Sequence, residues 1–445
     1  MTDRYAKLRL HVDGEQVTPS HLARTVDHAT RLLRDCGAEP GRGVLAPLSN
    51  GVAFVVAAAA AHRLGAPLVL RSPYSRTEGL PLAAETDDTG NRADPVAVKP
   101  LRPAADPFPE ETTLVCPTSG STGDPKLALF NADGQDHQNR ATAARLRYGP
   151  DDGLCLPLPL NHAYGFSVMG TAAHAGASLW LEPGGGVTAL TARVRNREVT
   201  SLDGVPGLYR TLIGRLRDPA GIRSLQALRV RGCGGEILPR ALEDRYRDLD
   251  APLHNGYGLT EAGPNVAVNH RDRPVAGTAG PPLDGTETRI DPETGELSVR
   301  SPSLSIGYHG PDTLPLTDGW LATGDRAEWR NGGLALTGRL SERLKIMGET
   351  VILSDLEAAV GYRPPVERTA LAALPDHRGE QRLHALVEAP GDADLSAWSN
   401  HLRAMLPPRL RPRSVRRVTA LPLLPNGKLD RARISAALYG RKEAQ

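Results

Sequence analysis

Residues 112–126 read Thr112-Thr113-Leu114-Val115-Cys116-Pro117-Thr118-Ser119-Gly120-Ser121-Thr122-Gly123-Asp124-Pro125-Lys126, an apolar run followed by hydroxyls, glycines and one lysine. The apolar run at 112–115 predicts a buried strand. Glycines let the main chain approach a ligand closely, and free N–H groups, hydroxyls and an ammonium group together bind phosphate oxygens. The stretch therefore indicates a phosphate-binding loop at the end of a strand, with a Ser/Gly-rich surface loop as the alternative.

A nucleotide-binding P-loop of the G-x-x-x-x-G-K-[ST] type is excluded. Pro125 instead of glycine precedes Lys126, and Leu127 instead of Ser or Thr follows it. The hydroxyl that such a loop gives to magnesium is therefore missing. The stretch instead resembles the phosphate loop of the adenylate-forming enzymes, which include acyl-CoA synthetases, peptide-synthetase adenylation domains and luciferases.

Composition limits the class of protein. A chain of 445 residues is too long for one ordinary core and predicts two or three domains. Its net charge of +2 gives no field that would favour nucleic acid, and no apolar run is long enough to span a membrane. The N-terminus lacks a signal sequence, and the cysteines form no C-x-x-C pair. We expect a cytoplasmic protein with reduced thiols and with neither a nucleic-acid nor a membrane partner.

The order of the expected elements predicts an α/β fold. Helices over 21–37 and 52–64 alternate with strands over 43–48 and 67–71, which is a βαβ pattern, and alternation resumes over 200–255. The stretch 72–111, rich in Pro, Asp, Ala and Thr, is interpreted as an irregular connection. Short strands broken by Gly, Pro and Asp over 277–338 predict a small β-barrel-like subdomain. We therefore expect a large N-terminal domain, 1–340, and a small α+β domain, 341–445.

Four further segments match the adenylate-forming family in its order. They are Y-G-L-T-E at 257–261, T-G-D at 323–325, G-R at 338–339 and P-N-G-K at 425–428. Chance agreement of all these motifs with the phosphate loop is far rarer than agreement of any one. The resemblance covers about residues 20 to 435 and implies an ATP- and Mg²⁺-dependent enzyme whose C-terminal domain is a mobile lid.

The resemblance also implies a nucleotide site. Tyr257 would stack near the adenine, the Thr260 hydroxyl would donate to the α-phosphate, and the Glu261 carboxylate would hold Mg²⁺. Asp325 would accept both ribose hydroxyls, and Arg339 would contact the ribose. The nucleotide-binding residues expected are Thr118, Ser119, Gly120, Ser121, Thr122, Gly123, Lys126, Gly234, Gly235, Glu236, Asn255, Gly256, Tyr257, Gly258, Thr260, Asp325 and Arg339.

Catalysis, in the same resemblance, depends on charge stabilisation. Lys126, Thr260 and Lys428 would stabilise the charge that develops as the carboxylate attacks the α-phosphorus and pyrophosphate leaves. The lid would then swing about Ser341 and present Gly348, which would line the tunnel for a thiol arm. Ser341 departs from the Asp or Lys usual at the hinge.

The acid pocket is expected at Asn161, His162 and Phe166, together with Gly234 and Gly258. Enzymes of this family that bind α-amino acids carry an aspartate near the first of these positions, and this chain has none there. A buried ammonium needs a paired anion. The sequence therefore favours an aryl or fatty acid without an α-ammonium group.

The acceptor stays open between several nucleophiles. No phosphopantetheine attachment segment is found, so the thiol would be free CoA or an acyl carrier protein in trans. Basic residues near the C-terminus could meet acidic CoA phosphates or an acidic carrier, although a solvated basic face is an equal alternative. These are Arg403, Arg409, Arg411, Arg413, Arg416 and Arg417. An amine acceptor, or a nucleotide-binding protein without turnover, are the remaining alternatives; Lys126, Glu261, Asp325 and Lys428 together argue against the last.

Overall fold

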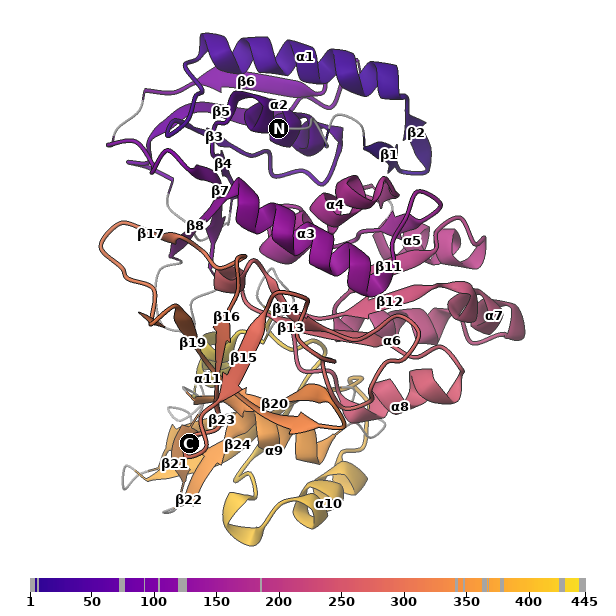
Figure 1. Ribbon diagram of the computed structural model, residues 1–445. Helices are drawn as coiled ribbons and strands as arrows, with labels where there is room; N and C mark the ends of the chain where they lie inside the picture. The colour runs from indigo at the N-terminus through magenta and orange to yellow at the C-terminus, as the bar shows by residue number, and fades with distance from the viewer. Residues whose placement is uncertain are drawn as a thin grey trace.

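The computed structural model describes most of the chain (Figure 1). The described residues are 5, 8–71, 77–91, 93–102, 105–118, 126–184, 186–340, 343–346, 349–361, 366, 368–376, 380–423 and 429–439. The N-terminal elements and the C-terminal domain occupy opposite ends of the molecule in this view, with the remaining α/β layers between them.

One large sheet has seven strands in the order β17-β8-β7-β4-β3-β5-β6. They are β3 (Gly43–Leu45), β4 (Leu68–Val69), β5 (Leu82–Asp88), β6 (Val96–Pro100), β7 (Thr112–Pro117), β8 (Leu127–Asn131) and β17 (Gly307–His309). Helices α1 (Pro19–Asp35) and α2 (Val52–Leu64) contact strands of this sheet, and the sequence predicted both helices. The buried strand predicted at 112–115 is confirmed as β7.

The interpretation of 72–111 as an irregular connection is wrong in part. This stretch contains β5 and β6, which pair antiparallel at the edge of the sheet. Leu82 and Ala84 of β5 are buried, which gives the strand a face on the core. Pro100 ends β6, and proline is tolerated there because an edge strand does not need every N–H in the ladder.

The second large sheet has eight strands in the order β14-β13-β12-β11-β9-β10-β1-β2. They are β1 (Arg9–Val12), β2 (Glu15–Val17), β9 (Gly153–Cys155), β10 (Ser178–Leu181), β11 (Ser201–Gly204), β12 (Val230–Cys233), β13 (His254–Gly258) and β14 (Asn265–Val268). The strands from β1 through β10, β9, β11 and β12 to β13 run parallel. Their carboxyl ends therefore meet at one edge, where ligands of open α/β sheets bind.

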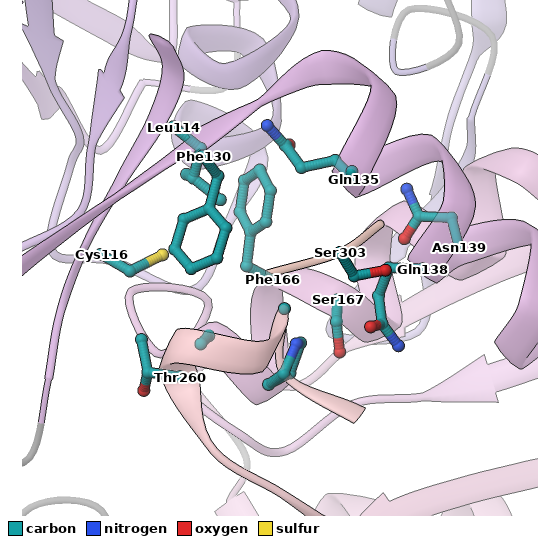
Figure 2. A pocket seen from close by; sticks show the side chains of 14 residues that line it. Leu114, Cys116, Phe130, Gln135, Gln138, Asn139, Phe166, Ser167, Thr260 and Ser303 are labelled. Atoms are coloured by element: carbon teal, nitrogen blue, oxygen red, sulfur yellow. The ribbon is translucent and has the colours of Figure 1, made fainter. Parts of the chain in front are cut away.

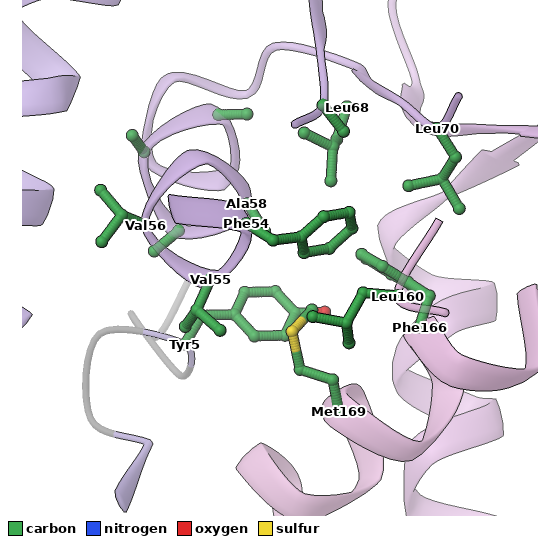
Figure 3. Packing of buried hydrophobic residues seen from close by; sticks show 14 of the residues in the cluster. Tyr5, Phe54, Val55, Val56, Ala58, Leu68, Leu70, Leu160, Phe166 and Met169 are labelled. Carbon is green, nitrogen blue, oxygen red and sulfur yellow. The ribbon is translucent and has the colours of Figure 1, made fainter. Parts of the chain in front are cut away.

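Helices pack beside and between the sheets. They are α3 (Ala132–Leu146), α4 (Ala163–Ala175), α5 (Gly186–Arg195), α6 (Pro206–Arg215), α7 (Pro219–Ala227) and α8 (Arg240–Asp248). Figure 3 shows the core where α4 meets α2: Phe166 and Met169 face Phe54 and Tyr5, and all four side chains are buried. The rings of Phe54 and Phe166 meet edge to face.

A smaller antiparallel sheet follows. It comprises β15 (Glu287–Ile290), β16 (Glu296–Arg300), β18 (Leu316–Thr317), β19 (Trp320–Arg330) and β20 (Gly333–Arg339). It encloses a core of its own that includes Leu297, Leu321 and Leu334. The small β subdomain predicted over 277–338 is thus confirmed.

The C-terminal part is α+β with a separate core around Trp398, Leu371 and Leu402. Its elements are β21 (Arg343–Ile346), β22 (Glu349–Ile352), α9 (Leu353–Val360), β23 (Arg368–Pro375), β24 (Gln381–Glu388), α10 (Ser396–Met405), β25 (Val415–Val418) and α11 (Arg431–Tyr439). The boundary at 340/341 stays a prediction. Within the described ranges, no helix is both long and apolar enough to cross a membrane.

Candidate active site

A cavity of about 420 Å³ lies where the separate motifs meet. Its wall combines the carboxyl ends of the parallel strands β11, β12 and β13 with the ends of β7 and β20 and with α3 and α4. The lining residues are Thr118, Lys126, Thr142, Leu146, Tyr148, Leu154, His162, Ala163, Tyr164, Ser167, Val168, Thr171, Asp203, Gly232, Cys233, Gly234, Gly235, His254, Gly256, Tyr257, Gly258, Leu259, Thr260, Glu261, Pro264, Asn265, Val268, Tyr308, Thr323 and Arg339.

Both ends of the predicted phosphate loop contribute to this wall. The Thr118 N–H donates to the Lys126 carbonyl over 2.7 Å, which closes the base of the loop between β7 and β8. The Lys126 ammonium lies 2.9 Å from Asp312 and 5.1 Å from the centre of the Tyr308 ring. Residues 119–123, also predicted for phosphate binding, lie outside the described residues. Leu127 is buried in the apolar cluster beneath the loop, which explains a large side chain at this position.

The Y-G-L-T-E segment enters the cavity from β13. Thr260 and Glu261 form the short 3₁₀ turn η2 (Thr260–Ala262), and both line the cavity. The Tyr308 hydroxyl donates to Glu261 over 2.8 Å. A Cβ atom at Gly258 would lie 1.8 Å from the Pro264 carbonyl oxygen, so only glycine fits this approach.

The chemistry of the donors fits a magnesium ion bound mainly through phosphate. Among the residues described, no three His, Cys, Asp or Glu side chains cluster as a metal site. Glu261 is half-buried and lines the cavity together with Lys126 and Thr260, so it can supply a single carboxylate to such an ion. Mg²⁺ commonly binds through one or two carboxylates together with substrate phosphates and water, which suits this arrangement.

Three predicted nucleotide residues form one hydrogen-bonded group. Asp325 on β19 lies opposite Arg339 on β20 in the strand register. Its carboxylate accepts a hydrogen bond of 2.7 Å from Arg339 Nε and one of 2.8 Å from the Tyr257 hydroxyl. Desolvation raises the pKa of Tyr257 well above its ordinary value, so the phenol stays a donor. Tyr257 and Arg339 line the cavity, and the buried Asp325 carboxylate is held by both of them at its edge.

Besides Asp325, four predicted residues in the described part of the chain do not line the cavity. Asn161 accepts from the Arg71 N–H and donates to the Pro47 carbonyl, so it fixes neighbouring loops. Phe166 lies in the core and borders a separate, much smaller cavity beside Phe130 and Gln135 (Figure 2). Packing and loop hydrogen bonds engage both side chains, and their role as pocket walls stays a prediction. His162, Gly234 and Gly258 do line the main cavity.

The other two residues are engaged elsewhere. Glu236 accepts a 2.9 Å hydrogen bond from Arg368 of β23, in the C-terminal part of the chain. Asn255 donates to the Thr278 carbonyl over 3.2 Å. Neither side chain reaches the cavity wall, so a nucleotide would meet at most the backbone there. Ser341, Gly348 and Lys428 lie outside the described residues.

Asp203 lines the cavity and was missed in the sequence. It lies near the carboxyl end of β11, within the range 200–255 for which strand–helix alternation was predicted, and a single carboxylate within a strand was the available signal. The argument that no carboxylate lies near the acid pocket is therefore corrected, because Asp203 is distant only along the chain. Its hydrogen bond from Tyr164, over 3.1 Å, brings it to the start of α4.

Comparisons with known proteins agree with this geometry. A family model described as "AMP-binding enzyme" matches residues 74–309. A feruloyl-CoA synthase from Amycolatopsis sp. is 30% identical over 94% of this chain and 93% of its own length. A probable 2-succinylbenzoate–CoA ligase from Mycobacterium tuberculosis is 29% identical over 75% of this chain and 86% of its own.

Solved structures share the fold. The o-succinylbenzoate CoA synthetase from Bacillus subtilis with its acyl-adenylate intermediate has a TM-score of 0.81 and 20% identity over 96% of this chain and 95% of that one. An amide bond synthetase from Marinactinospora thermotolerans has a TM-score of 0.80 and 22% identity over 98% and 99%. The predicted fold class and the prediction of an ATP-dependent, AMP-forming ligase are confirmed, and the chain belongs to the AMP-binding enzyme family.

Proposed function

We propose that this protein joins an aromatic carboxylic acid to the thiol of coenzyme A through an acyl adenylate. The observation that supports this proposal is the convergence of Thr118, Lys126, Thr260, Glu261 and Arg339, from separate motifs, on one cavity. The relatives named for feruloyl-CoA and 2-succinylbenzoate–CoA favour an aromatic acid and CoA. An acyl carrier protein in trans is the alternative thiol donor.

In the first step, a carboxylate oxygen attacks the α-phosphorus of ATP, and the bond to the bridging oxygen breaks to release pyrophosphate. Lys126, Thr260 and Lys428 stabilise the negative charge that spreads over the phosphate oxygens. Glu261 holds the Mg²⁺ that neutralises phosphate charge when it is bound. The ribose lies against Asp325 and Arg339, and the adenine lies against Tyr257 and the backbone of 234–235 and 255–258.

In the second step, the thiolate sulfur attacks the acyl carbon, and AMP leaves with the electrons of the acyl–phosphate bond. The domain 341–445 rotates about Ser341 relative to 1–340, withdraws Lys428 and brings Gly348 to the thiol.

Of the basic residues near the C-terminus, Arg411 and Arg417 donate to the Leu406 and Ala393 carbonyls, which limits their part in binding CoA phosphates.

A cytoplasmic location fits the chemistry of the thiols. The four cysteines are free, and Cys116, Cys155 and Cys233 are buried. Desolvation raises the pKa of each of these three thiols, so that they stay protonated.

The test is acid-dependent exchange of labelled pyrophosphate into ATP, followed by analysis of the nucleotide product with CoA present. We expect exchange with aromatic acids and AMP as the product. Lys428→Ala should lose exchange by at least about 100-fold while ATP still binds, because only charge stabilisation is removed. Lys99→Ala, whose side chain is 75% exposed, is the matched control and should keep full exchange. ADP as the product, or full exchange in Lys428→Ala, would contradict the proposal.

A further inference from the structure

Asp203 is a buried carboxylate in the wall of the cavity. It lies at the carboxyl end of β11 and is only 5% exposed. The Tyr164 hydroxyl donates to its Oδ1 over 3.1 Å, and the Tyr148 hydroxyl lies 3.5 Å from its Oδ2. The Tyr148 hydroxyl also meets the Ser201 hydroxyl at 2.6 Å. Two phenols and a carboxylate thus form one polar group in the wall.

This carboxylate lacks a cation. Across the described part of the chain, no Lys, Arg or His nitrogen forms an ion pair with Asp203. A carboxylate offers about four acceptor positions, and the hydroxyls of Tyr164, Tyr148 and Ser201 occupy at most three of them. Burial raises the pKa of Asp203 to about 6, so the group is mostly ionised at neutral pH. A buried anion of this kind is stable only when further donors or a cation complete its bonds.

The surrounding backbone makes room for the Asp203 carboxylate. A Cβ atom at Gly232 would lie 2.2 Å from Asp203 Oδ1, so a side chain at this position of β12 would displace the carboxylate. A Cβ atom at Gly234 would lie 3.4 Å from the Tyr164 ring and 3.4 Å from the Gly256 carbonyl oxygen. The Tyr164 ring therefore lies between Asp203 and the glycines of the nucleotide side, within one continuous cavity.

Apolar side chains form much of this part of the wall. Leu146, Leu154, Val168 and Val268 line the same cavity from α3, β9, α4 and β14. Such side chains accept a flat ring, and Asp203 with its two tyrosines offers an acceptor to a polar substituent. The neutral hydroxyls of Thr142, Ser167 and Thr171 also line the cavity, but Asp203 is the anionic acceptor in this part of the wall. A plain alkyl chain in this space would leave the anion unpaired.

We propose that Asp203 selects aromatic acids that carry a hydroxyl or amino group on the ring, and that it accepts a hydrogen bond from this group. The inference rests on the proposed acid activation and adds the substrate class. Tyr164 and Tyr148 are positioning residues, since their hydroxyls hold the carboxylate and not the ring substituent. A site built around a buried acceptor discriminates strongly against an analogue that lacks the donor.

The test compares matched substrates in the pyrophosphate exchange assay. Benzoic acids with a 3- or 4-hydroxyl, amino or methyl group have similar size and differ in the donor, and phenylalanine tests an α-ammonium group. We expect the wild-type kcat/KM to favour hydroxyl or amino over methyl by at least about tenfold. Asp203→Leu should remove or reverse this preference, and Asp203→Asn, which keeps one acceptor oxygen, should reduce it.

Asp318→Asn is the matched control. Asp318 is exposed at the turn before β19 and does not line the cavity, so the substrate ratio should not change. A shift of the thermal midpoint by ATP, measured for each variant, checks that the variant is folded. Equal turnover of hydroxyl and methyl acids, or an unchanged ratio in both Asp203 variants, would overturn this inference and leave acid activation intact. Phenylalanine as the best substrate would also overturn this inference. If none of the acids tested supported pyrophosphate exchange, the proposed function itself would be contradicted.

Discussion

The Tyr308 hydroxyl donates a hydrogen bond of 2.8 Å to Glu261 Oε1, and this bond joins two sheets. Tyr308 lies on β17, opposite Ala128 of β8, the strand that leaves the phosphate loop. Glu261 follows β13 of the other large sheet, and its carbonyl accepts from the Ser305 N–H over 2.8 Å. The carboxylate proposed for Mg²⁺ is thereby held in a fixed position relative to the ammonium group of Lys126.

Tyr308→Phe tests this relationship. The variant keeps the ring beside Lys126 and removes only the donor to Glu261. Because a hydrogen bond to a charged group contributes about 1.5–3 kcal/mol, we expect the Mg²⁺ concentration for half-maximal pyrophosphate exchange to rise roughly tenfold. Tyr439→Phe, at an exposed site on α11, is the control. An unchanged Mg²⁺ dependence would show that Tyr308 does not orient the carboxylate.

Asp312 competes with phosphate for Lys126. The two side chains are 2.9 Å apart and nearly half exposed, a setting in which an ion pair contributes 0–1 kcal/mol. We expect Asp312→Asn to lower the KM for ATP by up to about fivefold, since the ammonium no longer has to leave a carboxylate. Lys126→Gln should raise that KM in both backgrounds. A higher KM in Asp312→Asn would mean that the pair positions Lys126 instead of competing for it.

The sequence predicted the site best where the contacts are local. Thr118 and Lys126, at the two ends of the predicted phosphate loop, and Thr260 and Glu261 belong to contiguous motifs, and all four residues line the cavity. The T-G-D and G-R segments were predicted separately, and the hairpin register of β19 and β20 places Asp325 opposite Arg339.

Contacts between residues far apart in the sequence determine the features of the site that were not predicted. Asp203 meets Tyr164 across 39 residues, and Glu236 meets Arg368 across 132, and no local pattern reports either pairing. Phe166 is an aromatic residue of the kind that lines pockets. Its ring instead packs against Phe54 of the adjacent helix α2 and is part of the hydrophobic core. The strands β5 and β6 within 72–111 were not predicted for a related reason. Their prolines and aspartates are typical of loops, and an edge position tolerates them.

Asp325→Asn tests the ribose site. Asp325 is held by Tyr257 and Arg339, so an amide should keep the local fold while it weakens acceptance of the ribose hydroxyls. We expect the KM for ATP to rise by about tenfold or more, and the preference for ATP over 2′-deoxy-ATP to fall by a similar factor. Asp318→Asn, at an exposed turn with positive φ that Asn also tolerates, is the control. An unchanged nucleotide preference would exclude Asp325 from contact with the 2′-hydroxyl.

The buried charge of Asp203 should make stability depend on pH. Burial raises its pKa to about 6 in the folded protein, against about 3.9 in the unfolded chain. The folded state therefore binds the proton more tightly, so the destabilisation is absent below about pH 4, grows as the pH rises and is complete above about pH 6. The titratable groups near the carboxylate are Tyr148, Tyr164, Tyr209, Cys155 and Cys233. Burial raises the pKa of each of these phenols and thiols, so none of them titrates in this range.

Asp203→Asn removes the charge and keeps an acceptor for Tyr164. We expect its free energy of unfolding to exceed that of the wild type by up to about 3 kcal/mol at pH 8, because the shift in pKa is about two units. At pH 4 the two proteins should differ little. The measurement is the thermal midpoint of both proteins from pH 4 to pH 8, with Asp318→Asn as an exposed control. A constant difference across this range would mean that folding does not raise the pKa of Asp203, and a difference that still grows at pH 8 would mean that Asp203 stays protonated in the folded protein.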